Sequence, residues 1–381
     1  MFRKYPKNFQ DPHIDYPIHD LELSFSDYIK QTNNLIQTHR QDLLGENAAA
    51  IIEANTPFEL LPSGKSRNVG ILFIHGLLDS PFITRDIAKS LQNQGFITRS
   101  ILLPGHGMRP GSLLQVTYED WLQSLYYGVT SLTKVVEKII LIGFSTGAVL
   151  SAIHTLLRPE KIAGIVMLSP AIKINSFFDF ATNWHKVFSW LIPRAKWMSA
   201  REENDYVKYS STTYNAAYQV YRLTRTLKKM SQTTPLTCPV FMGLSYEDKI
   251  VSSLAAIQYF LSLPSPHNQM ILYASKQLNY KDKRIILRSG AYPEWHIKNF
   301  CHISIPIAPD NIHYGMNGDY PLASHVNRDN NIIYEALDIP TKKFYDLLYK
   351  LNLTSYQHQR LTFNPDFDFL SQKIKEFAEK L

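Results

Sequence analysis

Short apolar runs that alternate with longer amphipathic segments place the strongest limit on how this chain can fold. Four runs share a strand-like length and a mostly apolar composition; they are residues 70–74, 99–103, 138–142 and 161–168. The segments between them are long enough for helices, over residues 80–94, 118–134 and 146–157. Such runs are typical of strands buried on both faces, and crossovers of this length suit right-handed strand-helix-strand units. The pattern predicts an α/β fold with a mostly parallel, doubly wound sheet.

Two more strands and a last helix are predicted after a long interruption. The strands are residues 239–244 and 269–273, and the helix covers about residues 366–380. The interruption, residues 172–235, is rich in Phe, Trp and Tyr and is interpreted as an inserted helical lobe. Its aromatic side chains either form a small core of the lobe itself or line an apolar substrate channel.

The size of the chain is compatible with one large domain that carries an insertion. The chain has 381 residues, of which 45% are hydrophobic, so it can bury a large core. That length fits one α/β domain with an inserted lobe, or two domains, and we expect the first arrangement. Residues 1–60 are interpreted as an N-terminal extension with a helix over about residues 25–44, and residues 61–381 as the α/β domain.

Neither a transmembrane helix nor a secretory signal is visible in the sequence. Residues 139–157 and 250–275 are uncharged and long enough to span a bilayer, but the first stretch contains several polar side chains. The second is interrupted by Pro264 and Pro266. The first residues lack the apolar core of a signal peptide. We therefore expect a soluble, cytoplasmic protein, and secretion without a cleaved signal stays open.

Composition argues against several other classes of protein. The two cysteines, Cys238 and Cys301, are too few for a disulfide framework and lack the spacing of metal ligands. We therefore expect no bound metal, and we expect the protein to reside in a reducing compartment. The formal net charge of +7 comes from scattered basic residues, and no nucleic-acid-binding module is visible. We attribute this charge mainly to solubility.

A Gly-Phe-Ser-Thr-Gly pentapeptide at residues 143–147 connects the apolar run before it to the helical segment after it. Alone it is a weak signal, because small residues recur together by chance. At a strand-to-helix junction it gains meaning, because glycines two residues on either side relieve crowding around a strained serine. Ser145 is therefore the predicted nucleophile.

A serine hydroxyl needs a base to remove its proton, and the base needs an acid to orient it. In the chain order serine, acid, histidine, the acid is expected just beyond the next strand after the lobe. Asp248 occupies that place, and Glu247 is its rival. Asp248 is preferred because residues 249–252 resemble the turn into a following helix. The alternative that Asp248 only caps a helix starting near Ser252 stays open.

The base must come from the histidines that follow the last predicted strand. They are His296, His302, His313, His325 and His358. His302 is the predicted base, because the proline at position 306 stops regular structure after a short apolar run, and a side chain there can project over the end of the sheet. His296 and His313 remain alternatives. Residues 276–298 look inserted before the base, with an extra strand or hairpin near residues 284–287.

Attack on an ester carbonyl creates an oxyanion, which backbone N–H groups stabilise. The amide of Thr146 directly follows the nucleophile, and the amide of Leu77 lies in a loop where Gly76 permits a turn. These two amides are the predicted oxyanion hole. The side chain of His75 is expected to order that loop. His106 lies between two glycines and precedes Ser145, so it is left out of the site.

In combination these segments resemble the α/β-hydrolase superfamily, and within it the serine hydrolases that include carboxylesterases and monoacylglycerol lipases. The motifs that carry the resemblance are residues 74–77 (IHGL), 103–107 (LPGHG), 143–147 (GFSTG) and 246–251 (YEDKIV). The resemblance implies a mostly parallel sheet, a nucleophile turn, a lid inserted over residues 172–235, and no cofactor. A serine in the turn argues against the haloalkane dehalogenase and epoxide hydrolase branches, which use aspartate there.

The predicted activity is that of a carboxylesterase or lipase-like serine hydrolase. Ser145 attacks the carbonyl of a small-molecule acyl ester and forms an acyl-enzyme, His302 transfers the proton, and Asp248 orients His302. The aromatic lobe favours acyl or lipid-like substrates. An acyltransferase on the same fold and a catalytically inactive binding protein are the alternatives. A proline-releasing peptidase also resembles this fold, but the sequence marks no amine-binding pocket.

Basic residues on the lobe leave contact with an anionic membrane surface open. They are Lys186, Arg194, Lys196, Arg222, Arg225, Lys228 and Lys229.

Overall fold

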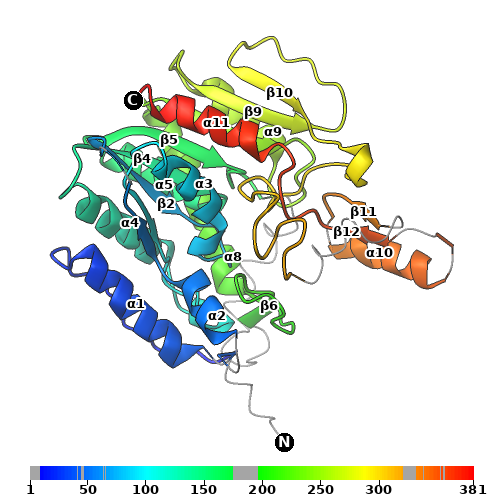
Figure 1. The fold of residues 1–381 in the computed structure, drawn as a ribbon, viewed down its shortest axis with the longest axis horizontal. Helices are drawn as coiled ribbons and strands as arrows, with labels where there is room; N and C mark the ends of the chain where they lie inside the picture. The colour runs from blue at the N-terminus through cyan, green and yellow to red at the C-terminus, as the bar shows by residue number, and fades with distance from the viewer. Residues whose placement is uncertain are drawn as a thin grey trace, which may run out of the picture. The chain divides into compact units, whose positions relative to one another are not determined.

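The computed structural model describes residues 9–40, 42–43, 47–62, 64, 66–174, 196–320, 332–337, 339–351, 353–354 and 357–381. The chain divides into two compact units (Figure 1). The first unit contains Met1–Ile165 and Ser176–Pro235, and the second contains Val166–Asn175 and Leu236–Leu381. The predicted lobe, where it is described, therefore belongs to the first unit.

The first unit is built on parallel strands that are buried on both faces. Its strands, in their order across the sheet, are β1 (Phe58–Leu60), β3 (Thr98–Ile101), β2 (Val69–Ile74), β4 (Lys138–Phe144) and the first half of β5 (Ile162–Leu168). β2 pairs in parallel with both β3 and β4, whereas β1 runs antiparallel to β3. The side chains of residues 71–74 and 139–141 are fully buried, which is why these strands are continuous apolar runs in the sequence.

The predicted crossover helices are confirmed, with small shifts at their ends. They are η2 (Pro81–Thr84) continuing into α3 (Arg85–Gln92), α4 (Tyr118–Leu132) and α5 (Thr146–Leu157). The first of them starts as a 3-10 turn with Pro81 near its start, where a missing N–H costs no helical hydrogen bond. α4 starts at a capping box, in which Thr117 and Asp120 satisfy each other's backbone N–H groups.

The N-terminal segment is packed onto the first unit. It forms α1 (Phe25–His39) and α2 (Ala48–Asn55), and α1 ends earlier than the predicted residue 44 because Arg40 is extended. The buried Tyr28 hydroxyl donates to the Leu102 carbonyl at 3.2 Å and accepts from the Leu102 N–H at 3.1 Å. Its ring lies 4.8 Å from that of Tyr127 on α4, next to which α1 lies in Figure 1.

The second unit continues the parallel arrangement. After the end of β5 come β8 (Val240–Ser245), β9 (Gln269–Ala274) and β10 (Ile285–Ser289), with parallel pairing of β9 to both β8 and β10. The helices α9 (Ser253–Ser262) and α11 (Phe367–Ala378) accompany these strands. The two later strands, the extra strand near residues 284–287 and the last helix are thus all confirmed.

A small subdomain that the sequence pattern does not predict lies between His302 and α11. It contains the parallel pair β11 (Ile332–Tyr334) and β12 (Gln357–Gln359) and the helix α10 (Ile339–Lys350) (Figure 1). Strands of three residues are too short to show a periodic pattern, so only their pairing reveals them.

The described part of the lobe combines a helix with a short ribbon. β6 (Trp197–Ser199) pairs antiparallel with β7 (Thr212–Thr213), and α8 (Tyr214–Thr233) packs against α4 and α5. Trp197 and Tyr209 are both buried in the first unit. Residues 175–195 lie outside the described part, and with them most of the aromatic cluster. Within the described residues, no helix combines the length and apolarity needed to cross a bilayer.

Candidate active site

Ser145 stands in a strained turn between β4 and α5. Its backbone has φ 53° and ψ −112°, in a region that non-glycine residues seldom adopt. A Cβ atom on Gly143 would lie 2.4 Å from the Ala148 nitrogen, and one on Gly147 would lie 2.2 Å from the Ile74 carbonyl oxygen. Both glycines are therefore required by close approach of backbone atoms. Crowding within the serine turn, as predicted, applies to Gly143, whereas Gly147 is required by the carbonyl groups at the end of β2.

The loop after β2 lies directly against this serine. A Cβ atom on Gly76 would be 3.1 Å from the Ser145 Cβ and 2.7 Å from a carboxylate oxygen of Asp79. Leu77, the residue after Gly76, is one of the two predicted oxyanion donors. The other, Thr146, is the first residue of α5, where unpaired N–H groups and the helix dipole favour negative charge.

His75 fixes the start of this loop through both ring nitrogens. Its Nε2 accepts the Leu103 N–H at 3.0 Å, so the proton is on Nδ1, which donates to the Gly76 carbonyl at 2.8 Å. Complete burial lowers the pKa of His75 to about 4, so the ring is neutral at pH 7. The expected ordering role of His75 agrees with these contacts.

Two residues from the lobe, Lys208 and Tyr209, hold the other end of the loop, and we call this pair the strut. The Lys208 Nζ lies 2.8 Å from an Asp79 carboxylate oxygen, and Asp79 is 2% exposed. The Tyr209 N–H donates to the Leu78 carbonyl at 2.9 Å. Leu78 has φ 68°, a costly conformation for leucine, so the loop needs such support. No local pattern marks the strut, because its partners are more than a hundred residues apart.

His106 supports the same region and has no visible acid-base role. Its Nδ1 lies 3.1 Å from the Pro104 carbonyl, and its ring is parallel to that of Tyr209 at 6.4 Å. Burial lowers its pKa to about 3, which keeps the ring neutral.

In the second unit the structure brings Asp248 and His302 together. One Asp248 oxygen lies 2.6 Å from the His302 Nδ1, and both side chains are buried. The other oxygen accepts the N–H groups of Ile250 at 2.7 Å and Val251 at 3.0 Å. The turn after β8 thus holds the carboxylate, the ring donates from Nδ1, and Nε2 is left as the basic nitrogen.

The rival acid Glu247 and the side chains of His313 and His358 have other partners. Glu247 accepts the Ser275 N–H at 3.0 Å and the Ser275 hydroxyl at 2.9 Å. His296 ends a 3-10 turn with φ 56°, and its carbonyl accepts the Tyr334 N–H. His313 is bonded to Asp319, and His358 to Glu335 at 2.6 Å. His325 lies outside the described residues. It is His302 that contacts Asp248.

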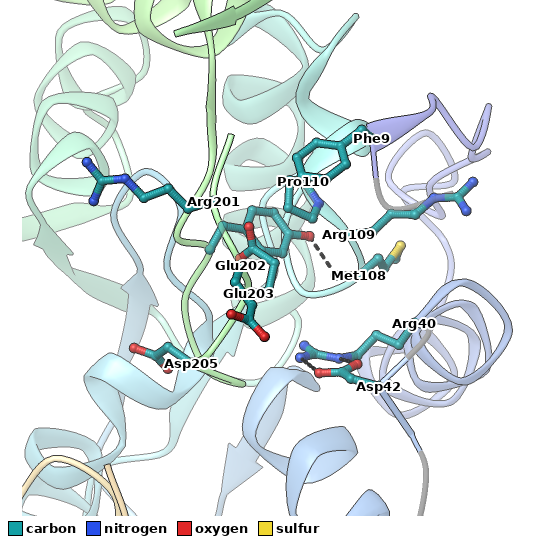
Figure 2. Close-up of a pocket in the computed structure, with 11 residues that line it drawn as sticks. Phe9, Arg40, Asp42, Met108, Arg109, Pro110, Arg201, Glu202, Glu203 and Asp205 are labelled. Atoms are coloured by element: carbon teal, nitrogen blue, oxygen red, sulfur yellow. Dashed lines mark hydrogen bonds and ion pairs between the residues drawn. The ribbon is translucent and has the colours of Figure 1, made fainter. Parts of the chain in front are cut away.

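A separate pocket of about 260 Å³ opens in the first unit (Figure 2). Met108, Pro110 and Tyr209 give it an apolar wall, and the remaining lining is mostly charged. Arg40 faces Asp42 in an ion pair of 2.6 Å, as Figure 2 shows. Burial raises the pKa of Glu203, whose carboxylate accepts the Ser210 and Ser211 N–H groups. None of the predicted site residues lines this pocket.

In the part of the chain that the structure describes, no group of three His, Cys, Asp or Glu side chains is placed to hold a metal ion.

A mostly parallel sheet flanked by helices, with a strained serine between a strand and a helix, defines an α/β hydrolase. The model of the family described as serine aminopeptidase, S33, matches residues 65–276. The match covers more than half of the chain, so this protein belongs to that family of hydrolases. The predicted superfamily and fold are confirmed.

Among known proteins the chain is 25% identical, over 226 residues, to a thermostable monoacylglycerol lipase of Bacillus sp. (strain H-257). That alignment covers 58% of this chain and 88% of the relative. Among solved structures, the monoacylglycerol lipase of Paleococcus ferrophilus is similar, with a TM-score of 0.47 and 19% identity over 57% of this chain and 88% of that one. A soluble variant of the Saccharomyces cerevisiae monoglyceride lipase has a TM-score of 0.48, with 12% identity over 57% and 82% of the two chains.

Proposed function

We propose that this protein hydrolyses carboxylic esters of acyl or lipid-like substrates through an acyl-enzyme on Ser145. The observation that carries the proposal is the backbone of Ser145, whose φ of 53° at the start of α5 is the strained conformation of a nucleophile turn. The buried hydrogen bond between Asp248 and His302 supports it, because it orients a histidine as a base. The relative named a monoacylglycerol lipase supports the ester as substrate.

In the proposed mechanism, His302 Nε2 takes the Ser145 hydroxyl proton as the serine oxygen attacks the ester carbonyl. The N–H groups of Leu77 and Thr146 stabilise the negative oxygen of the tetrahedral intermediate. Its collapse expels the alcohol, which receives the proton from His302, and leaves Ser145 acylated. Water then attacks the acyl-enzyme with the same proton transfers and releases the acid and free Ser145. Asp248 holds the ring and stabilises its charged form.

Two other reactions compete with ester hydrolysis on the same residues. The family description names an aminopeptidase, which requires a site for a free amino group. Acyl transfer requires an alcohol or amine in place of water, and uses the same nucleophile. A binding protein without activity is the remaining alternative, and it predicts that Ser145 does not react with a fluorophosphonate probe.

The experiment that tests the proposal compares esters with amides. The purified protein is assayed on p-nitrophenyl esters of increasing acyl length and on aminoacyl p-nitroanilides. We expect ester turnover that rises from acetyl to longer chains, with much slower amide turnover. Faster cleavage of the aminoacyl anilides would make the protein a peptidase. Formation of a new ester when acceptor alcohols are added would show transfer.

We also propose that the lobe contacts an anionic membrane surface. Of the basic residues named above, Lys186 and Arg194 lie outside the described part. Arg222 is paired with Glu119 at 2.7 Å, which reduces its contribution. The lobe contact therefore depends on Lys196, Arg225, Lys228 and Lys229, and vesicle binding at low salt tests it.

Because of the strut, the position of the loop that carries the Leu77 N–H depends on Lys208. Replacing Lys208 by methionine leaves the buried Asp79 carboxylate without its ammonium partner, so the loop is expected to shift. We expect kcat on a short ester to fall by about 10- to 100-fold, with a smaller change in KM, because misplaced donors weaken transition-state binding. Lys208→Arg, which keeps the charge, should restore most of kcat. A lower melting temperature with unchanged kcat would show that the strut only stabilises the fold.

A further inference from the structure

We propose that α10 and the turn after it form a docking surface for an anionic lipid bilayer. Within the described chain, thirteen large apolar side chains are exposed, and five of them fall in the ten residues that end at Leu353. They are Phe344 (57% exposed), Leu347 (51%), Tyr349 (37%), Leu351 (57%) and Leu353 (69%). Single exposed apolar residues are ordinary, whereas such a local concentration marks an interaction site.

Helical geometry gathers three of these side chains into one stripe. Phe344, Leu347 and Leu351 are spaced by three and four residues, which places them on the same face. The helical turn continues past Lys350, because the Leu351 N–H donates to the Leu347 carbonyl at 3.0 Å. A different face of α10 is attached to the subdomain, since the Tyr345 ring stacks on His358 of β12 at 3.7 Å and 10°. The stripe therefore points away from the surface to which the helix is attached.

A row of positive charge runs beside the apolar stripe. Lys343 and Lys350 are seven residues apart and share a face, and Leu347 lies four residues after Lys343. The third lysine of α10, Lys342, is paired with Asp346 at 3.0 Å on a different side of the helix. An apolar stripe next to a lysine row is the pattern of a helix that lies in a membrane interface, with apolar side chains among the acyl chains and ammonium groups at the phosphates.

The charge of the patch favours an anionic lipid surface over a second copy of the chain. Two copies that paired through this stripe would bring the rows of Lys343 and Lys350 close to each other, and each chain carries a formal charge of +7. An anionic bilayer complements both the lysines and the apolar stripe. This surface is distinct from the basic lobe residues, and it does not depend on which reaction Ser145 performs.

The test measures partition of the full chain into vesicles. The wild type is sedimented with phosphatidylcholine vesicles and with phosphatidylcholine-phosphatidylserine vesicles, at low and high salt. The patch variant is Leu347→Gln/Leu351→Gln, and the charge variant is Lys343→Gln/Lys350→Gln. The matched control is Leu254→Gln, a leucine on α9 with a similar exposure of 54%. Melting temperatures and turnover of a soluble short ester verify that each variant is folded.

We expect the wild type to bind the anionic vesicles and to be released by salt. The patch variant should bind at least tenfold more weakly, the charge variant should bind the anionic vesicles more weakly at low salt, and the control should bind as the wild type does. Short-ester turnover should be the same in all four proteins. Absence of wild-type binding at low salt, or equal binding by the patch variant, would overturn the proposal. A wild-type dimer that the patch variant dissociates would also overturn it, because a second copy would then cover the stripe.

Discussion

Replacing Ser145 by alanine should remove ester hydrolysis, with a fall in kcat of about 10⁴-fold or more, because no other group in the proposed mechanism can form the acyl-enzyme. The fold should persist, since alanine pays the same cost as serine for φ 53° at this position. The activity is measured by turnover of p-nitrophenyl esters, and the reactivity of Ser145 by labelling with a fluorophosphonate. The stability of the fold is measured by urea unfolding.

Two further variants sharpen that experiment. Ser145→Gly should be equally inactive yet more stable to urea by about 1 kcal/mol, because glycine adopts a positive φ without strain. Ser151→Ala is the matched control, since its buried hydroxyl donates to the Gly147 carbonyl at 2.8 Å in the same helix. It should stay active. Wild-type turnover by Ser145→Ala would refute the proposed function.

Replacing Asp248 by asparagine should lower kcat by about 10³- to 10⁴-fold. An asparagine oxygen can still accept the N–H groups of Ile250 and Val251, so the turn should fold. The amide NH₂ group then faces the His302 Nδ1, which favours the tautomer with the proton on Nε2, and that nitrogen can no longer act as a base. The rate of acyl-enzyme formation measures this effect directly.

Neighbouring residues provide the controls for this second prediction. Glu247→Gln should retain activity, because Glu247 contacts Ser275. Replacing His296, His302 and His313 singly by alanine should abolish acyl-enzyme formation only at His302. If Glu247→Gln were the more damaging change, or if His302→Ala still acylated at the normal rate, the proposed roles of Asp248 and His302 would be wrong.

Local pattern was sufficient for most of the sheet and its helices. The runs that became β2, β4, β8 and β9 are apolar because both faces of each strand are buried, and burial of this kind is visible residue by residue. The ends of the helices were less predictable. α1 stops at His39, where Arg40 turns to an extended conformation and its guanidinium donates to the Gly107 carbonyl at 3.2 Å, a contact that periodicity does not report.

The local sequence pattern did not predict elements that depend on partners far away in the chain. β1 exists because it pairs with β3, and β11 because it pairs with β12. The strut is similar, because the Lys208 ammonium meets Asp79 across 129 positions of chain. Neither partner carries a local signal for the other.

By itself the sequence predicted the serine turn and determined the α/β class, because the strand-to-helix junction and the periodic burial are both visible in the local pattern. Gly143 is needed by backbone atoms of residues 147 and 148, only a few positions away, whereas Gly147 is needed by the carbonyl groups of Ile74 and His75, at the end of the neighbouring strand. Only the tertiary structure decided between neighbouring or equivalent side chains. Asp248 rather than Glu247 meets His302 across 54 residues, since a turn sends successive side chains in different directions and only the folded chain shows which one finds a partner.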